Sequence, residues 1–158
     1  MFLIPNTQLK ALFFMKKIGL ISVVVMISHP AFAEDKCKPN LTEFDVCEQA
    51  QKIVTQVRPR LPLTLSENVI MKDVSADGNK IIAQVRLGVT EEEMLATASE
   101  THTSIDVAKS RMAEITKNGL CAKKNPLGSF IRLGGEMQYV YTYPSGKFFN
   151  AVTVSSCN

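Results

Sequence analysis

The stretch EMQYVYTYPSGKFFNAVTVSSC, residues 136–157, alternates polar and apolar residues on both sides of a Pro-Ser-Gly turn. A period of two is typical of strands, and the turn predicts a hairpin whose loop is residues 144–147. The expected cross-strand pairs are Tyr143 with Phe148, Tyr141 with Asn150, Tyr139 with Val152 and Met137 with Val154. One face of this hairpin is therefore rich in tyrosine.

The tyrosine-rich face has two interpretations. If helices cover it, the rings belong to the core and their hydroxyls must find partners. If it is bare, it is a binding surface, because a monomer rarely exposes so large an apolar strip. The core interpretation is favoured, since the sheet needs one buried face. For contact with a partner we expect Tyr141, Tyr143 and Phe148, with Arg132 at the edge.

A second hairpin is predicted upstream, from residue 63 onward. Apolar residues at 69–74 precede the turn Ala76-Asp77-Gly78-Asn79, and residues 80–87 then alternate cleanly. A helix over 41–57 comes before this hairpin, and Pro59 and Pro62 end it.

Another helix is predicted over residues 91–117. Thr90 and Glu93 form a capping box, and apolar residues follow at steps of three and four. The Ser- and Thr-rich stretch 99–104 is where this helix could break. A short helix starts at Asn125-Pro126.

The resulting order is α-β-β-α-(α)-β-β. Helices must bury their apolar stripes, and an antiparallel sheet offers one apolar face. The sequence therefore predicts an α+β fold, with a four-stranded antiparallel sheet made of two hairpins and helices packed on one face.

Residues 1–33 are typical of a signal peptide, and Met15 is a better start than Met1. Lys16 and Lys17 precede an apolar run of about ten residues, too short to span a bilayer, and Ala31 and Ala33 suit a signal peptidase. Residues 34–158 then form a single α+β domain. We expect an exported protein, without stable membrane insertion once the leader is cleaved.

The charge of the chain excludes one class of partner. The chain has 18 Lys and Arg against 15 Asp and Glu, but three of the lysines precede the predicted cleavage site and every acid follows it. The remaining domain is therefore balanced, and we expect no nucleic-acid binding.

All four cysteines follow the leader: Cys37, Cys47, Cys121 and Cys157. An even number in an exported chain favours disulfides. Three pairings are open, of which Cys37–Cys47 and Cys121–Cys157 are favoured because each fixes a terminal segment to its neighbour. With no C-x-x-C and a single mature histidine, we expect no metal site and no cofactor.

The residues of the domain do not converge on a catalytic centre. His102 lies between two threonines within a predicted helix, and Glu91, Glu92 and Glu93 are explained by helix capping. We therefore expect a non-enzymatic module that binds an unidentified protein. Two alternatives stay open, an inhibitor or immunity protein that blocks an enzyme or toxin with residues 144–147, and a binder of small apolar ligands. An uncovered final strand would also allow a homodimer through edge pairing.

The run GLCAKKNPLGSFIRLGGEMQYVYTYPSGKFFNAVTVSSC, residues 119–157, resembles small exported Gram-negative proteins of the quorum-sensing-regulated virulence factor family. The resemblance covers the last third of the chain and does not extend to Cys37 and Cys47. It implies a periplasmic or secreted α+β domain, associated with virulence or a secretion apparatus, and transfers no catalytic residues.

Overall fold

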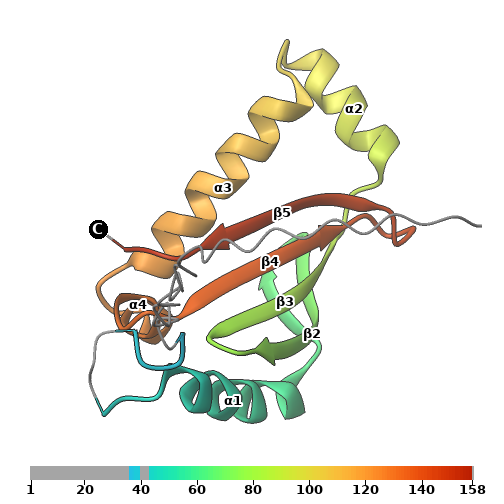
Figure 1. Cartoon of the computed structure of the whole chain (residues 1–158). Coiled ribbons are helices and arrows are strands. Elements are labelled where there is room, and N and C mark those ends of the chain that lie inside the picture. The colour runs from blue at the N-terminus through green and yellow to red at the C-terminus, as the bar shows by residue number, and fades with distance from the viewer. Residues whose placement is uncertain (1–35, 40–42, 158) are drawn as a thin grey trace, which may run out of the picture. The chain divides into compact units, whose positions relative to one another are not determined.

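The computed structural model describes residues 36–39 and 43–157, so the predicted leader lies outside the described residues. The described elements are α1 (Val46–Val57), η1 (Arg58–Arg60), β1 (Leu63–Ser66), β2 (Val69–Asp77), β3 (Lys80–Leu87), α2 (Glu91–Glu100), α3 (Ile105–Cys121), α4 (Pro126–Arg132), β4 (Glu136–Thr142) and β5 (Phe148–Val154) (Figure 1).

Within the described residues the sheet is mixed and has five strands, in the order β1-β2-β3-β4-β5. All neighbours are antiparallel except β3 and β4, which run parallel. The predicted four-stranded antiparallel sheet was therefore wrong in two respects. The extended stretch that begins at Leu63 is two strands, because residues 67 and 68 turn the chain back so that β1 pairs with β2. The three helices between β3 and β4 form a crossover, which returns the chain to the end of the sheet where β3 began.

One face of the sheet is buried. Along β3 and β4 the buried residues alternate with exposed or half-buried ones, as the period of a strand requires. The buried side chains of β2 to β5 form one cluster with those of α1, α3 and α4. The opposite face carries polar residues such as Gln84, Arg86 and Thr153, which are exposed. The helices therefore pack on one face, as the sequence predicted.

The long helix predicted over 91–117 is two helices. The capping box of Thr90 and Glu93 starts α2 as expected. The break falls in the Ser- and Thr-rich stretch, where the Thr101 hydroxyl donates to the carbonyl of Thr97 at 2.7 Å and His102 adopts a positive φ of 52°. The Ser104 hydroxyl then accepts from the amide of Val107 and starts α3. Local bonds from such side chains compete with the helical ladder, which explains the break.

Both disulfides favoured from the sequence are present. Cys37 and Cys47 join the N-terminal segment to α1, with Cα atoms 5.0 Å apart. α1 begins at Val46, later than predicted, because Asp45 caps it by accepting from the amide of Glu48 at 2.9 Å. Cys121 and Cys157 join the end of α3 to the segment after β5, with Cα atoms 5.2 Å apart. Each bridge therefore fixes one end of the described chain.

The helix α4 fixes where β4 begins. Asn125 caps α4, since its side-chain oxygen accepts from the amide of Leu127 and its side-chain nitrogen donates to the carbonyl of Gly119, both at 2.9 Å. A Cβ at Gly135 would lie 2.3 Å from the ring of Phe130. Only glycine therefore lets the chain pass this buried ring and enter β4.

Candidate functional site

The final hairpin departs from the predicted pairing at its turn. Three expected pairs form, namely Met137 with Val154, Tyr139 with Val152 and Tyr141 with Asn150. The expected pair of Tyr143 and Phe148 is wrong, because an irregularity in the register places Thr142 opposite Phe148. As a result Phe149, and not Phe148, turns into the core, where its ring packs edge-on to Tyr143 with centroids 5.3 Å apart.

The four residues expected to contact a partner do not lie together. Tyr141 and Tyr143 are buried, with 5% and 4% of their surface exposed, whereas Phe148 is 60% exposed. Arg132 is exposed, and its guanidinium donates to the carbonyl of Cys121 at 3.1 Å. The tyrosines thus contribute to the core, and contact of these residues with a partner stays a prediction.

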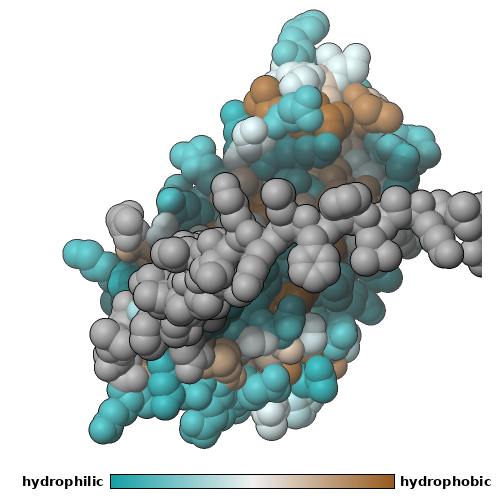
Figure 2. Space-filling model, in the orientation of Figure 1, coloured by the Kyte–Doolittle hydropathy of each residue, from teal (hydrophilic) through white to brown (hydrophobic). Residues whose placement is uncertain are grey.

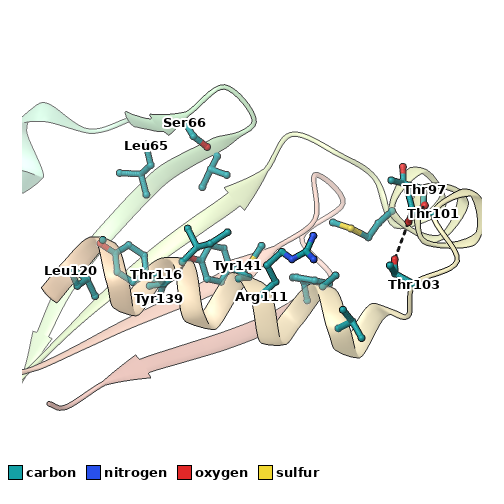
Figure 3. A pocket seen from close by; sticks show the side chains of 18 of the residues that line it. Leu65, Ser66, Thr97, Thr101, Thr103, Arg111, Thr116, Leu120, Tyr139 and Tyr141 are labelled. Atoms are coloured by element: carbon teal, nitrogen blue, oxygen red, sulfur yellow. Dashed lines mark hydrogen bonds between the residues drawn. The ribbon is translucent and has the colours of Figure 1, made fainter. Parts of the chain in front are cut away.

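An apolar groove lies between α2–α3 and the sheet, with a volume of about 780 Å³. Figure 3 shows Tyr139 and Tyr141 behind α3, with Leu65 and Ser66 on the far side of the groove. We call this space the α3 groove. Most of its lining is apolar: Leu65 and Val69 from β1 and β2, Met94 from α2, Val107, Ala108, Met112, Ile115 and Leu120 from α3, and Tyr139, Tyr141 and Phe149 from the hairpin.

The helices beside the groove, α2 and α3, contain many apolar residues but bury few of them. No residue of α2 is buried, and Leu120 is the one buried residue among the 17 described residues of α3. Ile115 and Val107 line the groove and are 65% and 48% exposed. Figure 2 shows apolar surface gathered over α2 and the adjacent end of α3. The apolar faces of these helices are therefore only partly covered by the described residues.

The ends of the α2–α3 pair are fixed to the final hairpin. At the start of α2, the Lys147 ammonium donates to both carboxylate oxygens of Glu91, at 2.7 and 2.6 Å, and this contact raises the pKa of Lys147. At the end of α3, Cys121 is bonded to Cys157. The groove thus lies beneath a pair of helices that is held at both ends.

Polar groups in the groove are few. Among the described residues that line it, Arg111 alone is charged, and Thr97, Thr101 and Thr103 lie together near the connection between α2 and α3 (Figure 3). On the floor, the Thr116 and Tyr141 hydroxyls are hydrogen-bonded at 3.0 Å. The rings of Tyr139 and Tyr141 stack with centroids 6.1 Å apart. An apolar lining with a few placed polar groups is typical of binding sites.

Burial raises the pKa of a tyrosine on the floor of the groove. Desolvation, with a smaller contribution from neighbouring Tyr141, raises the pKa of Tyr139 to about 12. The folded protein therefore holds this proton more tightly than the unfolded chain, whose tyrosines titrate near pH 10. Stability from this group is complete below pH 10 and is lost as the pH rises through 12.

We expect the free energy of unfolding to fall by about 2–3 kcal/mol between pH 10 and 12, since two pKa units correspond to that amount. Tyr139→Phe retains the ring but has no proton to lose, so its free energy of unfolding should fall less over the same range. Urea unfolding at several pH values measures both. Equal pH dependence in the two proteins would show that Tyr139 does not titrate as its burial requires.

Among the described residues, one group brings three possible metal-ligand atoms together. The Sγ atoms of Cys37 and Cys47 and a carboxylate oxygen of Asp45 lie within 4.8 Å of one another, but both sulfurs belong to the disulfide. His102 is exposed in the connection between α2 and α3. No helix of the described chain combines the length and the hydropathy of a membrane span.

The sequence did not reveal the α3 groove. The apolar residues that recur at steps of three and four over 94–115 predict a face that packs on the sheet, but Ile115 at the end of this stripe is largely exposed. Leu95 and Val107 stand beside this stripe and are also exposed. Their apolar side chains widen the stripe, and this was the available signal that the helices present more apolar surface than the sheet covers.

The sequence matches no protein-family model and no curated protein sequence. The fold is similar to that of a protein from Pseudomonas aeruginosa described as secreted, with a TM-score of 0.51, 13% identity, and coverage of 72% of this chain and 93% of the other. The type II secretion system pilotin AspS from Vibrio cholerae has a TM-score of 0.49 and 14% identity, and the match covers 71% of this chain and 89% of AspS. The type 2 secretion system pilotin EpsS from Vibrio vulnificus has a TM-score of 0.49 and 12% identity, with coverage of 72% and 92%. At these identities the likeness is one of fold alone.

Proposed function

We propose that this chain is an exported, non-enzymatic module that receives an apolar segment of a partner protein in the α3 groove. The observation that carries the proposal is the groove itself, an open apolar space beside α2 and α3. These two helices together have only one buried residue, Leu120. A monomer seldom leaves a contiguous apolar surface of this kind uncovered unless it binds something.

The shape of the groove supports an elongated occupant. Its α3 wall extends from Val107 to Leu120, which at about 1.5 Å per residue is roughly 20 Å along the helix axis. The wall residues recur every three or four positions and so follow one side of the helix. A helix or extended segment of a partner protein would contact this wall along several turns and would cover Val107 and Ile115.

Export supports the same class of function. The predicted leader, the two disulfides and the fold shared with the Pseudomonas protein described as secreted all agree with a location outside the cytoplasm. An association with virulence or with a secretion apparatus is the finer part of the proposal, and it rests on the resemblance of residues 119–157.

A small apolar ligand is the second candidate. The volume of about 780 Å³ lies within the range of roughly 300–1,000 Å³ that small-molecule sites occupy. An inhibitor that inserts residues 144–147 into an enzyme has less support, because Lys147 is paired with Glu91 and would have to leave this partner.

Site-specific photo-crosslinking in the native host tests the proposal. The photoreactive amino acid p-benzoylphenylalanine at Ile115 should yield one discrete adduct with another protein, because this side chain is 65% exposed on the wall of the groove. The control is the same amino acid at Gln84, which is exposed on the opposite face of the sheet.

We expect no adduct from position 84. The same protein adduct from both positions would contradict the proposal, because it would show contact without preference for the groove. An adduct at position 115 whose added mass is that of a small molecule would contradict the protein partner and support the second candidate.

A further inference from the structure

The outer edge of β5 is a second surface with chemistry suited to binding. Among the described strands β5 pairs with β4 alone, so its other side is an edge of the sheet. The strand has seven residues, FFNAVTV, and contains neither a charge nor a proline. The uncharged run continues to Cys157. From Asn150 to Val154 such an edge presents backbone donors and acceptors with no charge, proline or register irregularity among the described residues that prevents pairing with another strand.

The other edge of the sheet contrasts with it. β1 has only four residues, it directly follows Pro62, and its register with β2 is irregular between Thr64 and Ser66. A short strand, a nearby proline and a bulge are the features by which proteins block edge pairing. On the β5 edge the described register is irregular only between Phe148 and Asn150, and residues 150–154 pair regularly with β4. The longer regular part of this edge is therefore less protected than β1.

The β5 edge is also held in place at both ends. Before the strand, the amide of Tyr143 donates to the carbonyl of Lys147 at 2.9 Å, and Lys147 is paired with Glu91. After the strand, Cys157 is bonded to Cys121. A strand fixed in this way loses little conformational entropy when a second strand pairs with it.

We propose that a second copy of this chain pairs with β5 in antiparallel orientation, so that two five-stranded sheets form one continuous sheet. A two-fold axis brings the same strand to both sides of the interface, and a strand without charge meets no like charge when it pairs with itself. The Val, Phe and Thr residues of β5 are those that favour cross-strand packing. Phe148, which is 60% exposed at the start of β5, lies at this edge and contributes apolar surface to the pair.

The solvent-facing side chains of β5 show which residues would lie opposite each other in the dimer. Ala151 and Thr153 are exposed, and the buried Val152 lies between them. Antiparallel pairing centred on Val152 places Ala151 of one copy opposite Thr153 of the other, and pairing centred on Ala151 places the two Ala151 residues opposite each other. In both registers, like charges at 151 and 153 would lie close together across the interface.

The test measures the mass of the disulfide-bonded full chain in solution by analytical ultracentrifugation over a range of protein concentrations. The wild-type protein should reach roughly twice the monomer mass. Ala151→Lys/Thr153→Lys and Ala151→Glu/Thr153→Glu should each raise the dimer dissociation constant by about tenfold or more, because each places like charges across the interface. The matched control, Gln84→Lys, adds a charge on the same sheet face away from the edge and should leave the dimer intact.

Mixing the two double variants in equal amounts should restore the dimer, because lysines then face glutamates. Native mass spectrometry should show a mixed dimer rather than two homodimers. Rescue by mixing cannot come from misfolding of either variant. A wild-type protein that stays monomeric, or double variants that dimerise as the wild type does, would overturn the proposal.

Discussion

Replacing Cys121 and Cys157 with serine should lower the free energy of unfolding by about 3.8 kcal/mol. The bridge spans 36 residues of sequence, and the chain-entropy model assigns about that value to a closed loop of this size. The expected change is large because it is a substantial fraction of the roughly 5–15 kcal/mol that stabilises a typical domain. Urea unfolding of the oxidised wild-type protein and of the double variant measures it.

The Cys37–Cys47 bridge provides a matched comparison within the same chain. It spans only 10 residues, so the same model predicts a loss of about 2.7 kcal/mol for Cys37→Ser/Cys47→Ser. The two losses should therefore rank by loop length. A larger loss from the shorter bridge would show that local contacts at the end of α1, and not loop closure, determine what the bridges contribute.

Elements set by short-range chemistry could be predicted from the sequence. The final hairpin followed from alternation on both sides of Pro144-Ser145-Gly146, and the start of α2 followed from Thr90 and Glu93. Each of these signals lies within a few residues of the element that it specifies.

The sheet topology could not be predicted in the same way. Parallel pairing of β3 with β4 depends on how the three helices between them cross the sheet, and residues 88–135 separate the two strands in the sequence. No local pattern encodes that path. The division of the extended stretch after Leu63 into β1 and β2 depended on a turn at Glu67-Asn68, which lacks the glycine that marked the other turns.

The candidate site was predictable only in part. Alternation identified Tyr139 and Tyr141 as members of one face, and both lie on the floor of the α3 groove. A one-residue irregularity near the turn exchanged the roles of Phe148 and Phe149, and such bulges leave little trace in a sequence. The groove depends on where α3 lies relative to β1, and this is a tertiary property that periodicity does not contain.

Val107→Asp/Ile115→Asp should weaken binding of the partner protein by about 30-fold or more. The two side chains line the α3 groove, and a charge at each would lose its water when an apolar segment covers it. A loss of about 2 kcal/mol, as expected for central residues of an interface, corresponds to that factor. Because both positions are 48% or more exposed, the free energy of unfolding should change by no more than about 0.5 kcal/mol.

The dissociation constant between this protein and the protein captured at position 115 tests the groove most directly. Isothermal titration calorimetry of the wild type, of Val107→Asp/Ile115→Asp and of Gln84→Asp gives the three values needed, since Gln84 is exposed on the opposite face of the sheet. We expect the double variant to bind about 30-fold more weakly and Gln84→Asp to bind as the wild type does. Equal affinity of the double variant and the wild type would contradict the assignment of the α3 groove as the binding site.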